Sequence, residues 1–195
     1  MSERIVILLG DSQFVRLRRQ VSEFNLSTDQ FVNLAVSGAN IVKALHTLNK
    51  FVDENKTQIR LNKVAKNYVV FIFLGCNDLK YLKGEEEFNR HGFKKIINIC
   101  RKLFFNVRIL EIPPIPVFHD KWEEIVKINK WLNSFSGAKG LIVLPTSSCF
   151  PVQKFGERLL FFEQWYKGKH LKSDGLHLNE RGLLTIWQIM EQSLP

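Results

Sequence analysis

A serine, a histidine and an aspartate lie in two short motifs whose side chains complement one another chemically. Ser12 ends the motif "GDS", and Asp174 and His177 begin and end the motif "DGLH". A serine hydroxyl is inert near neutral pH unless a base removes its proton, and imidazole is the side chain that titrates there. Asp174 precedes His177 by three residues and would hold the imidazole in the required tautomer. The three residue types predict a nucleophile, a general base and an orienting acid for acyl transfer.

Two further motifs offer donors for the negative charge that acyl transfer develops on the carbonyl oxygen. Gly38 lies in "SGAN" and Asn77 lies in "GCND". The backbone N–H groups of Ser12 and Gly38 and the side-chain amide of Asn77 could form an oxyanion hole. A glycine at position 38 has no Cβ, so the backbone can approach a ligand closely. With the serine, histidine and aspartate, these donors complete the residue types that acyl transfer needs.

Each motif alone also has a simpler structural interpretation. In "GDS" either polar residue could cap a following helix, and Asn77 and Asp78 could stabilise their own turn. In "DGLHLN", Asn179 could be a helix N-cap, with His177 a partly buried, hydrogen-bonded histidine. Four motifs with complementary chemistry, in order along one chain, favour a site over four unrelated turns.

The elements that would position these motifs follow an alternation of apolar runs and amphipathic stretches, which is typical of an α/β domain with a parallel sheet. Five strands are predicted, at residues 4–9, 31–36, 68–74, 107–112 and 140–144. In an open parallel sheet, ligands bind at the carboxyl ends of the strands. "GDS", "SGAN" and "GCND" each follow a predicted strand, and "DGLH" precedes the last predicted helix. All four motifs therefore fall where this fold would place a site.

Helices are predicted at residues 13–26, 40–55, 84–104, 120–134 and 179–193. Right-handed crossovers would place them on both faces of the sheet, giving a three-layer α/β/α sandwich. Residues 145–172 have mixed character. This stretch could contain a short helix near "GERLLFFEQWY" and could form a lid.

Length and composition predict one domain, residues 1–195, whose core needs neither a disulfide nor a structural metal. Cys76, Cys100 and Cys149 lie far apart without the spacing of zinc ligands, which predicts free thiols. The apolar run near the N-terminus is too short for a signal-peptide core, and no run is long enough to span a bilayer. We expect a cytoplasmic protein without a metal or cofactor.

The chain is strongly basic, with a net charge of +9 and a pI near 9.6, which permits attraction to nucleic acid or to an anionic surface. Basic residues gather in two predicted helices: Arg16, Arg18, Arg19, Lys94 and Lys95. The aromatic and basic run "FFEQWYKGKHLK" could add a stacking surface for bases. Each cluster alone is explained by solvated helix faces and buried aromatic rings. Taken together with the charge, they make nucleic acid a candidate partner.

In their order along the chain, "GDS", the glycine of "SGAN", "GCND" and "DGLH" resemble the four blocks of the SGNH hydrolases, the GDSL-type esterases and lipases. The blocks span residues 10–177. The resemblance assigns the family's Ser, Gly, Asn and His to Ser12, Gly38, Asn77 and His177, with Asp174 as the triad acid. It implies a flavodoxin-like fold with a five-stranded parallel sheet. It also implies hydrolysis of a small carboxylic ester through an acyl-Ser12 intermediate, without a metal.

Two features depart from the common family pattern. Gln13 stands where the common motif has leucine, and arginines follow the nucleophile in the first predicted helix. Short basic versions resemble the esterase domains of some retrotransposons, and also the Oskar-type domain, an SGNH-like fold that binds RNA and has lost the catalytic set. The alternative function is therefore an RNA- or DNA-binding module with little or no hydrolase activity. The intact set of catalytic residue types favours the esterase.

Overall fold

The structure is a computed structural model. It describes the backbone of residues 4–21, 30–63, 68–81, 88–104, 106–150, 161–167 and 170–195. Within these ranges, side chains are not described at residues 21, 60–63, 81, 119, 163–167 and 170–175.

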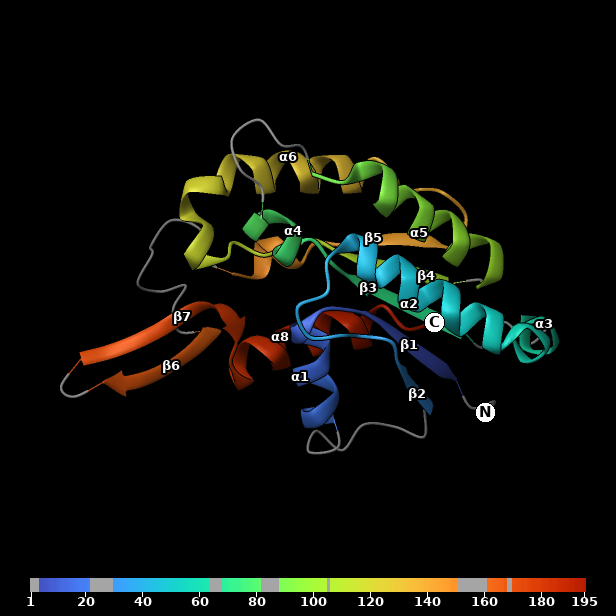
Figure 1. The fold of residues 1–195 in the computed structure, drawn as a ribbon, viewed down its shortest axis with the longest axis horizontal. Coiled ribbons are helices and arrows are strands. Elements are labelled where there is room, and N and C mark those ends of the chain that lie inside the picture. Colours follow the sequence, from blue (N-terminus) through green and yellow to red (C-terminus); the bar gives the residue numbers. More distant parts are fainter. Residues whose placement is uncertain are drawn as a thin grey trace.

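Five parallel strands form the central sheet, in the order β2-β1-β3-β4-β5 (Figure 1). The strands are β1 (Ile5–Gly10), β2 (Gln30–Asn33), β3 (Tyr68–Phe73), β4 (Asn106–Leu110) and β5 (Leu141–Leu144). Every residue of β3 is buried, as expected for a central strand in a sheet that is covered on both faces. Each of the five predicted apolar runs overlaps one of these strands, with ends that differ by at most three residues, so the predicted fold class is confirmed.

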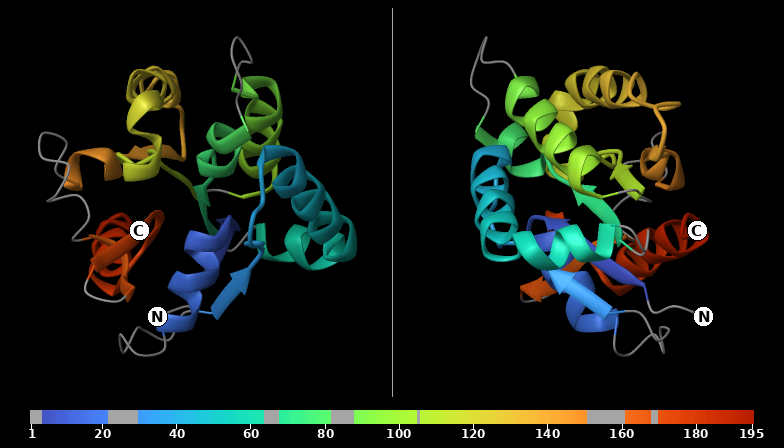
Figure 2. Two further views of the ribbon diagram at one scale, coloured as in Figure 1. Left: turned by 60° about the vertical axis from the view of Figure 1, so that its left-hand side comes forward. Right: turned by 90° about the vertical axis from the view of Figure 1, so that its right-hand side faces the viewer.

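Helices cover both faces of the sheet and complete three layers (Figure 2). On one face α1 (Ser12–Val21) packs against α8 (Glu180–Gln192). The other face carries α2 (Ile41–Glu54), α3 (Lys56–Lys63), α5 (Arg90–Leu103) and α6 (Trp122–Asn133). Three shorter helical segments lie after β3, β4 and β5: α4 (Cys76–Tyr81), η1 (Pro116–Lys121) and η2 (Thr146–Cys149).

Asparagine side chains cap three of the long helices. Asn40, Asn89 and Asn179 each accept a hydrogen bond from the backbone N–H three residues further on, at 3.0, 2.9 and 3.0 Å. An N-cap of this kind contributes about 1 kcal/mol to stability. Asn179 is the N-cap anticipated in "DGLHLN", and it fixes the start of α8 just after His177. The caps of α2 and α8 therefore anchor the segments that contain Gly38 and His177.

A separate antiparallel hairpin consists of β6 (Phe162–Lys167) and β7 (His170–Leu178). It extends away from the central sheet (Figure 1). The predicted short helix near "GERLLFFEQWY" is wrong for residues 162–166, which are strand. Aromatic residues favour strands, and pairing with β7 supplies the tertiary contacts that local sequence does not reveal. Residues 151–160, on which the predicted lid partly falls, lie outside the described residues.

The remaining differences concern helix ends and short helices. α1 is described to Val21, and residues 22–29, which include the end of the predicted helix, lie outside the described residues. α5 begins at Arg90, later than predicted, and residues 82–87 are not described. α3 and α4 were not predicted; α4 has only 6 residues, too few for a helical period to stand out.

Gly75, which follows β3 at the carboxyl edge of the sheet, can be compared with Gly137, which lies between α6 and β5. Gly75 has a φ of 121° and Gly137 a φ of 92°. A Cβ at Gly75 would lie 2.6 Å from the side chain of Ile112, whereas a Cβ at Gly137 would meet nothing within 4 Å. Both alanine variants should lose stability through backbone strain, and Gly75→Ala should lose about 1–3 kcal/mol more because it overpacks a buried side chain. Urea unfolding of both variants measures the difference, and equal losses would contradict this account.

Candidate active site

The motif that contains Ser12 forms where β1 passes almost directly into α1. β1 ends at Gly10 and α1 begins at Ser12. A Cβ at Gly10 would lie 2.8 Å from both the Phe14 ring and the Phe73 carbonyl oxygen, so the close passage of strand and helix requires glycine. Ser12 is partly exposed and lies at the carboxyl edge of the sheet, where such folds bind ligands.

Main-chain hydrogen bonds beyond β2 bring the second motif to the same edge. The Leu34 N–H donates to the Leu8 carbonyl at 2.9 Å, and the Val36 N–H donates to the Gly10 carbonyl at 3.1 Å. Gly38 follows with a φ of 69°, and a Cβ there would meet nothing within 4 Å. Its backbone conformation, rather than crowding by neighbouring protein atoms, therefore accounts for glycine at this position.

Ser12 and His177 lie within hydrogen-bonding distance although they are 165 residues apart in sequence. The Ser12 Oγ lies 3.1 Å from the His177 Nε2. His177 is the last residue but one of β7, and β7 packs against α1 and α8. In the tautomer with an unprotonated Nε2, the hydroxyl donates to the ring nitrogen, which is the geometry that a general base needs.

Asp174 lies in β7, three residues before His177. Its side chain is one of those that the structure does not describe. The structure therefore shows that Asp174 and His177 lie in the same strand. A contact between the Asp174 carboxylate and the His177 imidazole stays a prediction.

Asn77 joins the first three motifs. It lies in the first turn of α4 and is 8% exposed. Its Nδ2 donates to the Asp11 Oδ2 at 3.3 Å and to the Ala39 carbonyl at 3.0 Å. Because Asp11 and Ala39 are the neighbours of Ser12 and Gly38, the amide holds together the turn that contains Ser12 and the turn that contains Gly38 (the glycine turn). The nitrogen predicted as an oxyanion donor is thus engaged within the protein in this structure.

Asp78 adds a second connection between α4 and the glycine turn. Its two carboxylate oxygens accept from the Ile41 N–H at 3.2 and 3.1 Å, at the start of α2. A carboxylate is stabilising at a helix N-terminus. The sequence suggested that Asp78 stabilises its own turn, whereas the structure shows that it also caps a helix from another part of the chain.

Burial is the main cause of the raised pKa values of the side chains beside Ser12. Asp11 is 1% exposed, and burial raises its pKa from 3.8 to about 7, against the lowering effect of the hydrogen bond from the Gln13 N–H. Burial also raises the pKa of Asp78 from 3.8 to about 6. The buried Cys76 thiol has a pKa well above its usual value, chiefly through burial. Cys76 is therefore an unionised thiol near neutral pH and no competitor to Ser12 as nucleophile.

Gln13 is a residue of the site that the sequence marked only as a departure from the family pattern. Its Nε2 donates to the Leu176 carbonyl at 2.7 Å, and its Oε1 accepts from the Leu178 N–H at 3.1 Å. The two backbone groups lie on either side of His177. A glutamine next to Ser12 is visible in the sequence, but its partners lie at the other end of the chain.

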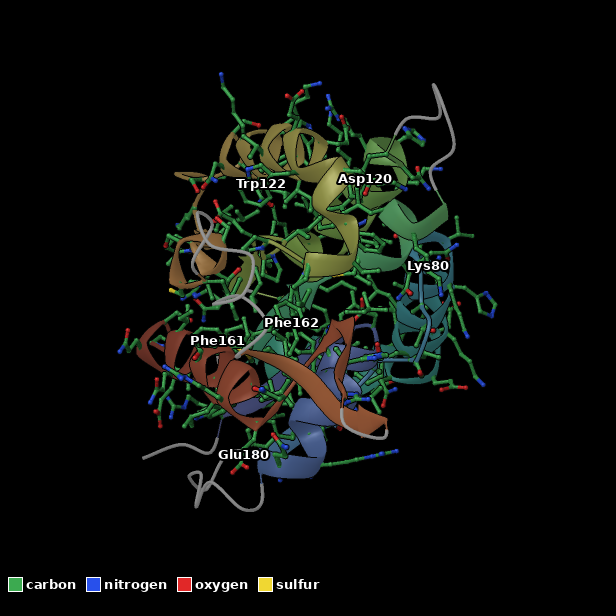
Figure 3. The ribbon with its side chains drawn as sticks, turned by 90° about the vertical axis from the view of Figure 1, so that its left-hand side faces the viewer. Lys80, Asp120, Trp122, Phe161, Phe162 and Glu180 are labelled. Carbon is green, nitrogen blue, oxygen red and sulfur yellow. The ribbon has the colours of Figure 1, made fainter. Side chains whose placement is uncertain are left out.

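Phe161 and Phe162 lie where the hairpin meets the start of α8 (Figure 3). The Asn179 N–H donates to the Phe161 carbonyl at 3.0 Å, and the Asn179 Nδ2 donates to the Phe162 carbonyl at 3.1 Å. Phe162 is fully buried. The base of the hairpin is therefore fixed to the body of the protein close to His177.

Metal-binding clusters and membrane-spanning helices are both absent from the described part of the chain. No group of three or more His, Cys, Asp and Glu side chains there could hold a metal ion. In the same residues, no helix is long and apolar enough to cross a membrane.

The parallel sheet in the order β2-β1-β3-β4-β5 defines a flavodoxin-like α/β protein. At its carboxyl edge a serine and a histidine are in contact. The model of the GDSL-like lipase/acylhydrolase family matches residues 9–183. The chain therefore belongs to the GDSL-like lipase/acylhydrolase family, as the four motifs predicted. Family membership supports a hydrolase activity in general terms.

Solved structures share the fold over almost the whole chain. A GDSL-like lipase from Bacteroides thetaiotaomicron VPI-5482 has a TM-score of 0.69 at 14% identity, covering 97% of this chain and 86% of that one. A lipase/acylhydrolase from Enterococcus faecalis has a TM-score of 0.64 at 18% identity, covering 97% and 95%. The OSK domain of Drosophila Oskar has a TM-score of 0.62 at 19% identity, covering 96% and 86%. No curated protein matches the chain in sequence.

The buried Asp11 carboxyl predicts a pH-dependent stability. Because its pKa is raised from 3.8 to about 7 in the folded protein, its contribution is fully present below about pH 4 and is lost as the pH rises to about 7. The loss is on the order of 4 kcal/mol. Asp11→Asn should remove this part of the pH dependence. The variant should also lose stability by a pH-independent amount, because an amide has one acceptor oxygen and cannot accept both bonds.

The measurement is urea unfolding of wild type and Asp11→Asn at several pH values between 4 and 8. Comparing the two slopes isolates the titration of Asp11 together with its coulombic coupling to Asp78. Equal slopes for the two proteins would show that Asp11 does not titrate in this range.

Proposed function

We propose that this protein is a serine-dependent carboxylic-ester hydrolase that acts through an acyl-Ser12 intermediate. The observation that carries the proposal is the 3.1 Å contact between the Ser12 Oγ and the His177 Nε2. Membership of the GDSL-like lipase/acylhydrolase family supports the reaction class. Small esters are the proposed substrates.

In the proposed reaction, the Ser12 oxygen attacks the ester carbonyl while its proton passes to the His177 Nε2. The tetrahedral intermediate collapses, and the alcohol leaves with that proton. Water then attacks the acyl-serine, with His177 again taking a proton and returning it to Ser12. Asp174 is proposed to stabilise the imidazolium that forms in both steps.

The negative charge of each tetrahedral intermediate needs donors at the carboxyl edge of the sheet. No described residue accepts a hydrogen bond from the backbone N–H of Ser12 or Gly38, which leaves both groups available for an oxyanion. Asn77 is proposed as the third donor, exchanging one of its present bonds, to Asp11 or to the Ala39 carbonyl, for the substrate oxygen.

Short p-nitrophenyl esters test the proposal. Wild type should hydrolyse them, Ser12→Ala should not, and a fluorophosphonate should label Ser12. Asn77→Ala should lower turnover by about 10²–10³-fold through the loss of one oxyanion donor. Wild-type turnover no faster than that of Ser12→Ala, together with no labelling of Ser12, would exclude the hydrolase.

We propose nucleic-acid binding as a second candidate function, because α5 presents cations and no acid. Its sequence contains no Asp or Glu, and five of its side chains are exposed cations: Arg90, Lys94, Lys95, Arg101 and Lys102. α2, which packs beside α5, adds the exposed Lys43, whereas its Lys50 pairs with Glu54 at 3.9 Å. Such a face suits the phosphates of RNA or DNA.

The arginines of α1 contribute less to this surface than the sequence suggested. α1 and α5 lie on opposite faces of the sheet (Figure 2), so their cations do not form one surface. The Arg18 guanidinium lies over the Phe31 ring, 5.4 Å from its centre, and Arg16 is partly buried. Phe162 of the aromatic run is in the core.

A salt series of filter-binding measurements with single-stranded RNA tests the α5 face. Changing Lys94 and Lys95 together to Gln should weaken binding and reduce the slope of log K against log salt by about 1.4, roughly 0.7 for each phosphate of a single strand that a lysine no longer neutralises. The matched control changes Lys127 and Lys130 of α6, both exposed, to Gln and should leave the slope unchanged. Affinity in the millimolar range at physiological salt would exclude this function.

A further inference from the structure

The strand that carries His177 is irregular where the histidine lies. Phe162 of β6 pairs with Leu178 of β7, and Gln164 pairs with Ser173. Residues 174–177 of β7 therefore lie opposite a single residue of β6. A bulge of this kind removes ladder hydrogen bonds and redirects side chains, and bulges are common next to active sites. The pairing with β6 does not hold the backbone around His177 in a regular ladder.

Gln13 provides hydrogen bonds at this place from the opposite side. Its amide donates to the Leu176 carbonyl at 2.7 Å and accepts from the Leu178 N–H at 3.1 Å. One residue of a neighbouring parallel strand bonds in the same way. Its N–H donates to the residue before the one that it faces, and its C=O accepts from the residue after it. The side chain thus adds two strand-like hydrogen bonds where the pairing of β7 with β6 shifts register.

Burial makes these two bonds costly to break. Gln13 is 3% exposed and Leu178 is fully buried, so breaking these bonds would leave the Gln13 amide and the Leu178 N–H without water to replace them. Gln13 also bonds to the turn that contains Ser12, because its own N–H donates to the Asp11 Oδ1 at 3.0 Å. One residue therefore links the turn that contains Ser12 to the strand that contains His177.

We propose that Gln13 is a positioning residue that holds His177 against Ser12 through the backbone groups of Leu176 and Leu178. The inference rests on the proposed esterase function for its catalytic consequence. Gln13 touches neither the substrate nor the reacting atoms in this proposal. It sets the place of the imidazole, and a displacement of a catalytic group by about 1 Å can lower a rate by about 10²-fold.

The test compares Gln13→Met with Gln20→Met. Methionine resembles glutamine in length and volume but offers neither bond. Gln20 is a second glutamine of α1, and its buried Oε1 has no hydrogen-bond partner among the described residues, so its replacement controls for the same change in the same helix. Gln13→Asn is a milder second variant, since its amide is one methylene shorter and can reach at most one of the two partners.

Two readouts are expected to change in the Gln13 variants and not in Gln20→Met. Hydrogen exchange at the Leu178 amide should accelerate by about 5-fold or more, the equivalent of one hydrogen bond of about 1 kcal/mol. With a p-nitrophenyl ester, kcat should fall by about 10- to 100-fold while KM changes little. Substrate binding does not use Gln13, so the loss should appear in kcat.

Unchanged exchange at Leu178 in both Gln13 variants would overturn the proposal. Equal loss of kcat in Gln20→Met would also overturn it, by showing a general effect of changing α1. If wild type neither hydrolyses esters nor reacts with a fluorophosphonate at Ser12, the proposed function fails. In that case the exchange rate at Leu178 still decides whether Gln13 holds this strand.

Discussion

The side-chain amide of Asn77 forms the buried interaction on which the rest of the site depends. It donates to Asp11 and to the Ala39 carbonyl, and so joins the loops that follow three strands of the sheet. Neighbouring parallel strands end at one edge, which brings these loops close together. Close approach alone does not fix their relative positions. Hydrogen bonds between buried polar groups do so, because breaking one leaves an unpaired group without water.

This arrangement places a carboxyl group in an unfavourable environment. Asp11 accepts bonds from the Gln13 N–H and from Asn77, yet burial still raises its pKa to about 7. The protein therefore tolerates a buried titratable group directly before Ser12. Perturbed groups of this kind gather at functional sites because such sites need polar groups in fixed positions within a packed edge. Asp11 acts here through the turn that it organises.

His177 reaches the site from a less regular part of the fold. Its strand belongs to a hairpin outside the central sheet, with a bulge at residues 174–177. Contacts on three sides fix the end of that strand: the side chain of Leu178 in the core, the Asn179 cap of α8, and the amide of Gln13. Glutamine in place of the common leucine thus has a structural explanation in this chain. An apolar side chain at position 13 would leave two backbone groups of β7 without these partners.

The sequence by itself determined the five-stranded parallel sheet, the place of the four motifs at its carboxyl edge and the family to which the chain belongs. Strand and helix periods are local properties, and parallel strands share an edge whatever their distance along the chain. Only the tertiary structure decided that residues 162–166 pair as a strand and that Asp78 caps α2. It also decided that the cations of α1 and α5 lie on opposite faces of the sheet, and that Gln13 bonds to the residues on either side of His177. These features depend on contacts between segments far apart in sequence, such as Gln13 and Leu178, which are separated by 165 positions. Side-chain hydrogen bonds over such distances follow from how the layers pack, and no local pattern of residues encodes them.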